Sequence, residues 1–383
     1  MKLDSDADGA VGMARVAVLH NTLDFHGGAD AVALTTCDAL EDEHTVDLFT
    51  ISTTDPGDLA SQYGLDIDIR VREPPGAALI AHGFAAAAPH VGPQLDSRSA
   101  LLAIFFRRHA DAYDLAVSTT NELAIPCRSI QYVHYPQFHL NWLPDRAATA
   151  GPLNRLWSHV GGPARGRGPS DATLVANSTW TATAVQLLYG QRPEVVYPPV
   201  PPIEGREPWA EREQGVVVIG RIAPERRVTD AIDIVDGVRE RGYDLHLHIV
   251  GSAPPAYRRY VEHVWGAVAE REHVSLETDV SRERLEALLC THRYGVNTCR
   301  YEPFGIGLAE YLAAGMLAFA PANGGQVEVL DGRADRLFES VDDAVERLTC
   351  AIDTGARPDL PLNRFGRDRF RQSMRALVAD ALE

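Results

Sequence analysis

The sequence predicts an α/β fold made of two facing, doubly wound domains of the Rossmann-like type. Short apolar runs alternate with helical patterns along the chain, which is typical of parallel sheets covered by helices. The alternation runs twice, and the proline-rich stretch 197–202 separates its two halves. With 383 residues, 45% of them hydrophobic, the chain is long enough to form two cores.

The chain is therefore expected to divide into two domains with a segment at each end. Residues 1–13 are polar and acidic and form a disordered tail. Residues 14–200 form an N-terminal domain, and residues 201–365 form a C-terminal domain. Residues 366–383 form a closing helix, which can cross back to the N-terminal domain.

Apolar runs of strand length predict the two sheets. In the first half they lie at 14–20, 45–51, 115–119, 129–133, 173–177 and 195–197. In the second half they lie at 216–219, 245–250, 274–277, 295–298 and 316–320. Helical patterns follow several of these strands, and two more, at 342–352 and 367–382, close the chain.

The charge of the chain limits the partners that it can have. The net charge is -17, from 53 acidic and 36 basic residues, which argues against general nucleic-acid binding. Lys2 is the only lysine, and every other basic residue is an arginine. An acidic, lysine-poor, alanine-rich chain fits the high-salt cytoplasm of a halophilic archaeon, and genomic base bias is the alternative explanation.

The cysteines and the apolar runs indicate the compartment. Five cysteines are scattered without a C-x-x-C pair, which favours free thiols in a reducing, cytoplasmic setting and no metal centre. No apolar run reaches the roughly 18 residues that a membrane span needs. In the segment 140–168, arginines stand beside tryptophans. This pattern suits peripheral contact with the cytoplasmic face of a membrane, and the glycines and prolines there suit a flexible loop equally well.

The stretch 301–315, YEPFGIGLAEYLAAG, is the strongest candidate site. It predicts a glycine turn after a strand, followed by a helix whose N-terminal N–H groups can bind an anion or a hydroxyl. Glu302 precedes the helix and Glu310 lies within it, so the two carboxylates can reach two ends of one long polar ligand. The alternative is an ordinary helix N-terminus, at which acidic side chains complement the helix dipole.

Two features of the first half also follow predicted strands. Gly27 and Gly28 lie in the turn HGGAD, where backbone could contact a phosphate or a sugar, or where the turn merely needs positive φ. The pattern G-x-G-x-x-G is absent there, so the turn gives little support for a dinucleotide-binding site. His134 follows the strand at 129–133, at an edge where ligands bind in such sheets. The alternative for His134 is a hydrogen-bonded loop histidine.

These motifs, in this order, resemble those of the GT-B-fold, retaining glycosyltransferases of glycosyltransferase family 4. In the second half, GRIAPERR at 220–227, the stretch at 301–315 and APANGGQVEVL at 320–330 carry the resemblance. In the first half, HGGAD, YVHYP and VANSTWT are similar to motifs of the lipid-linked oligosaccharide mannosyltransferases of N-glycan assembly. The resemblance covers most of the chain from Ala14 onward and is thin at 74–108 and 140–168.

The resemblance implies roles for the charged residues of the second half. Arg221 and Arg226 would hold the diphosphate of the donor. Glu302 would bind hydroxyls of the donor sugar, and Glu310 would accept hydrogen bonds from the ribose. The family usually has a lysine where Arg226 stands, so the contact geometry is expected to differ. Arg300 and its neighbour Tyr301 replace small residues, which leaves the donor sugar open.

The resemblance also implies roles for backbone groups and for one imidazole. Gly27 and Gly28 would close over the phosphates from the other domain, and His134 would bind near the donor sugar. The N–H groups that would touch sugar or phosphate belong to Phe304, Gly305 and Ile306.

The implied reaction transfers a hexose from a nucleotide sugar, either GDP-mannose or UDP-glucose, to a glycan or lipid-linked acceptor, with no metal required. Fixed arginines and helix N-termini would stabilise the leaving diphosphate. The alternatives are a nucleotide-sugar epimerase, another GT-B enzyme such as a glycan phosphorylase, and a non-catalytic partner that binds sugar nucleotides. A Rossmann oxidoreductase is disfavoured by the missing dinucleotide pattern.

Overall fold

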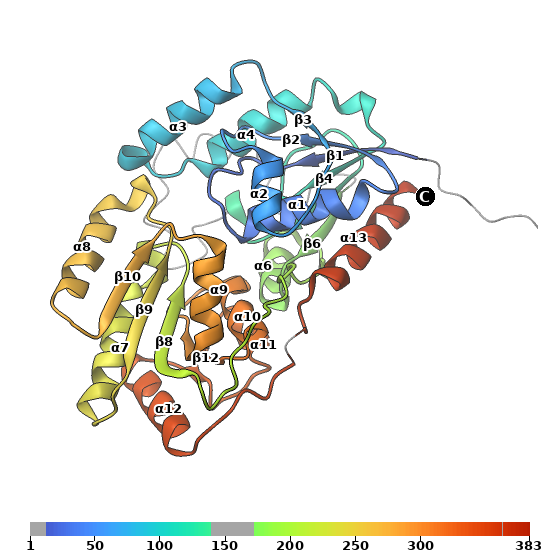
Figure 1. The fold of residues 1–383 in the computed structure, drawn as a ribbon. Coiled ribbons are helices and arrows are strands. Elements are labelled where there is room, and N and C mark those ends of the chain that lie inside the picture. Colours follow the sequence, from blue (N-terminus) through green and yellow to red (C-terminus); the bar gives the residue numbers. More distant parts are fainter. Residues whose placement is uncertain (1–12, 139–171, 362) are drawn as a thin grey trace, which may run out of the picture.

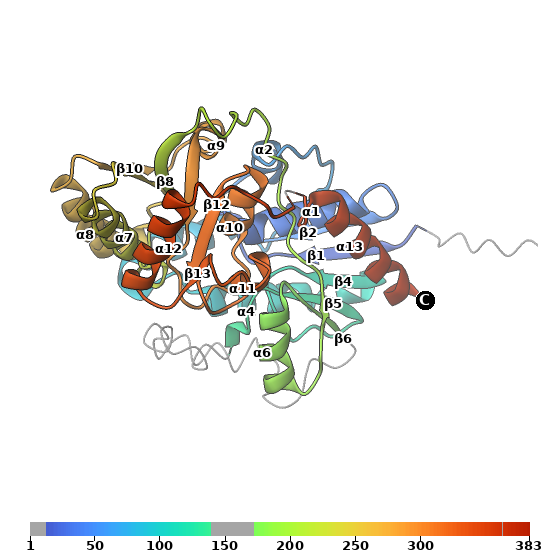
Figure 2. The ribbon, with the colours of Figure 1, turned by 90° about the horizontal axis from the view of Figure 1, so that it is seen from below.

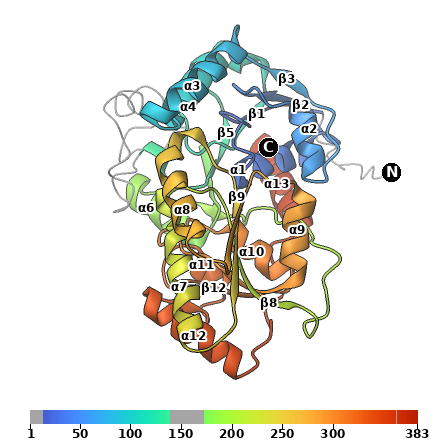
Figure 3. The same cartoon turned by 60° about the vertical axis from the view of Figure 1, so that its left-hand side comes forward.

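The computed structural model describes residues 13–138, 172–361 and 363–383, which form two α/β domains (Figures 1 and 3). The predicted N-terminal tail, except for Met13, and the whole of the segment 140–168 lie outside the described residues. Within the described part, no helix is both long enough and apolar enough to cross a bilayer.

The N-terminal domain is built on a seven-stranded parallel sheet with the strand order β3-β2-β1-β4-β5-β6-β7. Its strands are β1 (Arg15–Leu19), β2 (Thr45–Phe49), β3 (Arg70–Arg72), β4 (Leu115–Ser118), β5 (Ser129–Val133), β6 (Ala172–Ala176) and β7 (Glu194–Val195). Its helices are α1 (Gly28–Leu40), α2 (Pro56–Gln62), α3 (Ala77–Val91), α4 (Leu95–Phe106) and α6 (Thr179–Tyr189). The inner strands are almost wholly buried, which explains their continuous apolar sequences.

The C-terminal domain repeats this architecture on a six-stranded parallel sheet with the order β10-β9-β8-β11-β12-β13. Its strands are β8 (Glu213–Ile219), β9 (His246–Gly251), β10 (Val274–Thr278), β11 (His292–Val296), β12 (Leu317–Pro321) and β13 (Leu337–Phe338). Its helices are α7 (Val228–Glu240), α8 (Arg258–Ala269), α9 (Arg282–Thr291), α10 (Ile306–Ala313), α11 (Gln326–Val329) and α12 (Val341–Asp353).

Each sheet has one point at which the strand order reverses. In the N-terminal sheet this point lies between β1 and β4, and in the C-terminal sheet it lies between β8 and β11. Loops that leave neighbouring strands at such a point diverge to opposite faces of the sheet, which opens a crevice at the carboxyl ends of the strands. The glycine turn after β1 and the loop after β8 both stand at these points.

The last helix, α13 (Arg367–Leu382), packs on the N-terminal domain beside α1 (Figures 1 and 2). Phe370, Met374 and Val378 of α13 are buried in the core beneath the N-terminal sheet. The chain thus crosses between the domains twice. The two crossings pair where the amide of Val200 donates to the carbonyl of Phe365 at 2.9 Å.

Several strands differ from the sequence prediction, and β8, for example, begins at Glu213 and not at 216. The edge strands β3 and β13 were not predicted, because they are only three and two residues long. The strand predicted at 295–298 runs instead from His292 to Val296, because polar His292 and Arg293 conceal its beginning.

Candidate functional site

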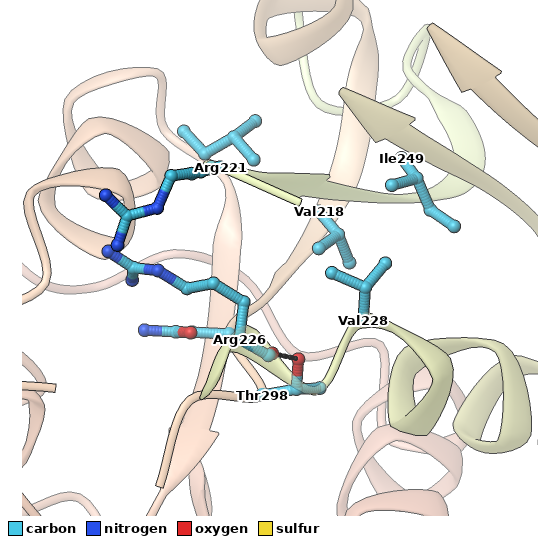
Figure 4. Close-up of a pocket in the computed structure, with 9 residues that line it drawn as sticks. Val218, Arg221, Arg226, Val228, Ile249 and Thr298 are labelled. Atoms are coloured by element: carbon cyan, nitrogen blue, oxygen red, sulfur yellow. Dashed lines mark hydrogen bonds between the residues drawn. The ribbon is translucent and has the colours of Figure 1, made fainter. Parts of the chain in front are cut away.

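A pocket lies at the carboxyl end of β8, where the loop 220–227 leaves the sheet (Figure 4). Arg221 and Arg226 line it together with Asn297 and Thr298, which follow β11. The Thr298 hydroxyl donates a 2.7 Å hydrogen bond to the carbonyl of Arg226 and so holds the two loops together. Two segments far apart in sequence therefore form one wall at the reversal point of the C-terminal sheet.

The two arginines of this pocket are held by carboxylates. Arg221 donates to Glu225 at 2.8 Å. Arg226 forms an ion pair with Glu302, the first glutamate of the 301–315 stretch. Burial disfavours the charged form of Arg226, but the charge of Glu302 outweighs it, so the pKa of the guanidinium is raised. In both arginines the Nε–H group is buried and has no hydrogen-bond partner in the described part of the chain.

The glycine turn that follows Glu302 leads into helix α10. Gly305 has φ of +97°, a conformation that favours glycine, and it forms the N-cap of the helix. The side chain of Phe304 packs in the core against Phe365, with ring centroids 5.2 Å apart. Only its backbone is therefore free to meet a ligand. Ile306 is the first residue of α10, so the amides of the turn include the unpaired donors of a helix N-terminus.

The second glutamate of the stretch has a different arginine as its partner. Glu310 is buried and forms an ion pair with Arg282, the first residue of α9. The Nη2 group of Arg282 is buried without a partner in the described part of the chain. Neither glutamate lines the small pocket that contains Arg221 and Arg226. Each is paired with a different arginine, Glu302 with Arg226 and Glu310 with Arg282.

Gly27 and Gly28 lie where the N-terminal domain meets the start of α10. A Cβ atom at Gly28 would lie only 2.2 Å from Cδ1 of Ile306, so the starts of α1 and α10 face each other across the domain boundary. The amide of Gly27 donates to Asp30 at 2.9 Å. Neither glycine has positive φ. The close approach of the Ile306 side chain from the other domain, and not a strained turn, is what favours glycine at position 28.

His134 lies after β5, on the N-terminal side. Its Nε2 atom is 3.1 Å from the carbonyl of Thr119, and its amide donates to Asn121 at 2.7 Å. Burial, and after it the neighbouring His20, lowers the pKa of His134 to about 4. The ring is therefore neutral at neutral pH and is suited to hydrogen bonding more than to proton donation.

Several residues that join the domains at this site have no role predicted from the sequence. The Ser178 hydroxyl donates to the carbonyl of Pro303 at 2.5 Å. Glu328 accepts a 2.9 Å hydrogen bond from the amide of Thr179 and a 3.0 Å bond from the Tyr197 hydroxyl. The motif VANSTWT contains two of these residues, and its serine followed by a helical pattern is the signal that could have revealed an N-cap.

Part of the chain matches a known protein family. Residues 213–354 match the family described as Glycosyl transferases group 1. This range contains both pocket arginines, both glutamates and Arg282.

Curated relatives match part of the chain. A GDP-Man:Man(3)GlcNAc(2)-PP-Dol alpha-1,2-mannosyltransferase of Eremothecium gossypii is 28% identical over 164 residues, which cover 39% of this chain and 28% of that protein. The protein of the same name from Dictyostelium discoideum is 27% identical over 186 residues, which cover 43% of this chain and 37% of that protein. The match thus spans about a third of the length of these relatives.

Solved structures match nearly the whole chain. HepE of Anabaena, in complex with UDP and glucose, gives a TM-score of 0.67 at 14% identity and covers 96% of this chain and 100% of that one. WaaG, a glycosyltransferase involved in lipopolysaccharide biosynthesis, gives a TM-score of 0.63 at 15% identity and covers 96% and 98%. The prediction of two Rossmann-like domains in a GT-B arrangement is confirmed.

Proposed function

We propose that this protein is a retaining glycosyltransferase of family 4 that moves a hexose from a nucleoside diphosphate sugar to a glycan or lipid-linked acceptor. One observation carries the proposal: Arg221 and Arg226 meet at one pocket, each with a buried Nε–H that has no partner in the described residues. An unmet buried donor costs on the order of 1–3 kcal/mol, which a diphosphate would offset. The match of residues 213–354 to a glycosyltransferase family supports the same conclusion.

The chemistry follows from where charge develops. The bond between the anomeric carbon and the diphosphate oxygen breaks, and the acceptor oxygen forms a new bond to that carbon on the same face. The acceptor proton passes to the leaving phosphate. The sugar becomes oxocarbenium-like while negative charge grows on the diphosphate. Arg221 and Arg226 neutralise that charge with fixed guanidinium groups, so no metal ion is needed for this step.

The two glutamates contact opposite ends of the donor, one at the sugar and the other at the ribose. The diphosphate competes with Glu302 for Arg226 and frees the carboxylate to accept hydrogen bonds from the sugar. Glu310, held by Arg282, binds the ribose hydroxyls. The remaining contacts come from the amides of Phe304, Gly305 and Ile306, from Gly27 and Gly28, and from His134.

The donor and the setting rest on the relatives and on the composition. The names of these mannosyltransferase relatives specify GDP-mannose and a dolichol-linked acceptor, which favours the same donor and acceptor here. UDP-glucose, which is bound in a structure of HepE, is the second candidate donor. The net charge of -17 with a single lysine supports a halophilic source and a cytoplasmic protein that works in concentrated salt. Contact with the cytoplasmic face of a membrane would bring the enzyme to a lipid-linked acceptor.

The test is a transfer assay with GDP-mannose and UDP-glucose, in molar salt and in the presence of EDTA. Arg221→Ala and Arg226→Ala are expected to lower turnover by about 10²–10³-fold with unchanged circular dichroism. Arg226→Lys keeps the charge and is expected to fall between Arg226→Ala and the wild type. Arg258→Ala, at a position whose side chain is 79% exposed on α8, is the matched control.

Three outcomes would contradict the proposal. Full turnover in both alanine variants would exclude the arginines from the reaction. Conversion of the donor to an epimer without acceptor would indicate an epimerase. Donor binding, seen as a rise in melting temperature, without transfer to any glycan or polyprenyl-linked acceptor would indicate a non-catalytic partner.

A further inference from the structure

Three histidines gather at the amino ends of the C-terminal strands, on the edge of the sheet opposite the arginine pocket. His246 begins β9, His248 follows two residues later on the same face, and His292 begins β11. Their ring centroids lie 4.7–5.3 Å apart, and one nitrogen from each lies within 4.8 Å of the others.

A glycine in the strand between them makes this meeting possible. β8 separates β9 from β11, and Gly215 of β8 pairs in register with His246. A Cβ atom at Gly215 would lie 2.4 Å from Nε2 of His246 and 2.5 Å from Cδ2 of His292. Any side chain there would therefore occupy the space in which the imidazoles converge. Glu213, two residues earlier on the same face of β8, points its carboxylate at the same space.

The hydrogen bonds around the rings fix which nitrogen is available. Nδ1 of His292 is 2.8 Å from the carbonyl of Leu288, which can only accept, so Nδ1 carries the proton. Its Nε2 lone pair is thus directed at Nε2 of His246, 3.1 Å away. Nδ1 of His248 is likewise bound, at 2.8 Å, to the hydroxyl of Ser275. Metal-binding histidines are oriented by such partners on the nitrogen that does not bind the metal.

We propose that His246, His248, His292 and Glu213 form a binding site for a divalent transition metal ion, with Zn²⁺ as the best fit. In a tetrahedral zinc site, the ligand atoms lie about 3.3 Å from one another. Nε2 of His246 is 3.1 Å from Nε2 of His292 and 3.4 Å from the nearer oxygen of Glu213, and the distance from that oxygen to His292 is 3.9 Å. Three imidazoles and a carboxylate are a donor set that zinc accepts.

The chemistry of the cluster favours a cation. Three imidazoles and a carboxylate converge on one space, and each can offer a lone pair to a metal ion. A bound ion would join β8, β9 and β11 and is expected to act on stability, because it lies far along the strands from Arg221.

Metal binding is measured on full-length protein that has been stripped with a chelator and freed of any histidine tag. We expect one equivalent of Zn²⁺ to bind by calorimetry and to raise the melting temperature. Co²⁺ should give the absorption of a tetrahedral site. His246→Gln is the first variant, because the His246 side chain is 32% exposed and its loss is tolerable for folding. His263→Gln, at an exposed position on α8, is the matched control.

The expected result is an affinity for Zn²⁺ that falls at least about tenfold in His246→Gln and in Glu213→Gln, while His263→Gln resembles the wild type. Zinc binding that is equal in His246→Gln and the wild type, or no binding by the wild type, would overturn the inference. These readouts involve no sugar nucleotide, so the metal site and the proposed glycosyl transfer stand or fall separately.

Discussion

Gly28 of the N-terminal domain lies directly against Ile306 of the C-terminal domain, so close that a single added carbon would be 2.2 Å from the isoleucine side chain. Each of these residues opens a helix, α1 and α10 respectively. The N-termini of two helices, one from each domain, thus face each other at the domain boundary. Two positive helix ends favour an anion between them.

Gly28→Ala is expected to lower kcat/KM for the donor, because the new methyl group must displace the Ile306 side chain or push the domains apart. Overpacking of this kind costs about 1–3 kcal/mol. The double variant with Ile306→Ala should recover much of the loss, because the clash is with that side chain. Gly83→Ala, in α3 with nothing near its Cβ position, is the control. Steady-state kinetics of the four proteins decide the matter, and an unaltered kcat/KM in Gly28→Ala would argue against a closed donor site.

Arg282→Ala is expected to raise the donor KM about tenfold with little change in kcat, because it leaves Glu310 buried without its cation. Arg284→Ala is the matched control on the same helix, since Arg284 pairs with Glu277 at 2.8 Å and is half exposed. The measurement is initial-rate kinetics against donor concentration. Equal KM values in the two variants would show that Glu310 and Arg282 do not contribute to binding of the ribose.

Glu122 makes the stability of the N-terminal domain depend on pH. Burial raises the pKa of this carboxyl from 4.5 to about 7, although the Tyr189 hydroxyl donates to it at 2.9 Å. A raised pKa means that its stabilising contribution is complete below about pH 4.5 and is lost as the pH rises through about 7. Glu122→Gln is therefore expected to remove about 3 kcal/mol of the stability difference between about pH 5 and about pH 8.

Urea unfolding of this variant and of Glu272→Gln, an exposed position, provides the measurement. The surface variant should keep the pH dependence of the wild type. An equal dependence of the unfolding free energy on pH in the wild type and in both variants would show that the pKa of Glu122 is not raised.

Salt is expected to stabilise the protein through its net charge of -17. Screening shortens the range of charge repulsion from about 10 Å at 0.1 M salt to about 3 Å at 1 M salt. The melting temperature should therefore rise with KCl at about pH 8, and should rise less near the pI of about 5.2, where the net charge vanishes. Scanning calorimetry at both pH values tests this, and equal increments would point to a general effect of salt on hydration.

The sequence was sufficient for most of the fold because buried parallel strands are continuous apolar runs. It failed where strands are short or polar. The edge strand β3 contains Arg70 and Arg72, and β11 begins with His292 and Arg293, so neither has an apolar signature at those positions. These strands are fixed by pairing with their neighbours, which depends on the assembled sheet.

The candidate site, like the fold, was only partly predictable from the sequence. Motifs placed Arg221, Arg226 and Glu302 in one region, and in the structure both arginines line one pocket while Glu302 pairs with Arg226. The pair of Arg282 with Glu310 joins residues 28 positions apart on different helices, and no local pattern encodes it. It depends on how α9 and α10 pack side by side, which only tertiary structure determines.

The return of α13 to the first domain has a consequence for synthesis of the protein. Phe370 and Met374 complete a hydrophobic core that includes residues translated more than three hundred residues earlier, such as Val16 and Val32. During translation, one face of the N-terminal sheet therefore stays exposed to solvent until α13 has emerged from the ribosome. A nascent chain arrested after α12 should bind chaperones that recognise exposed apolar surface, and release of the final residues should end that binding.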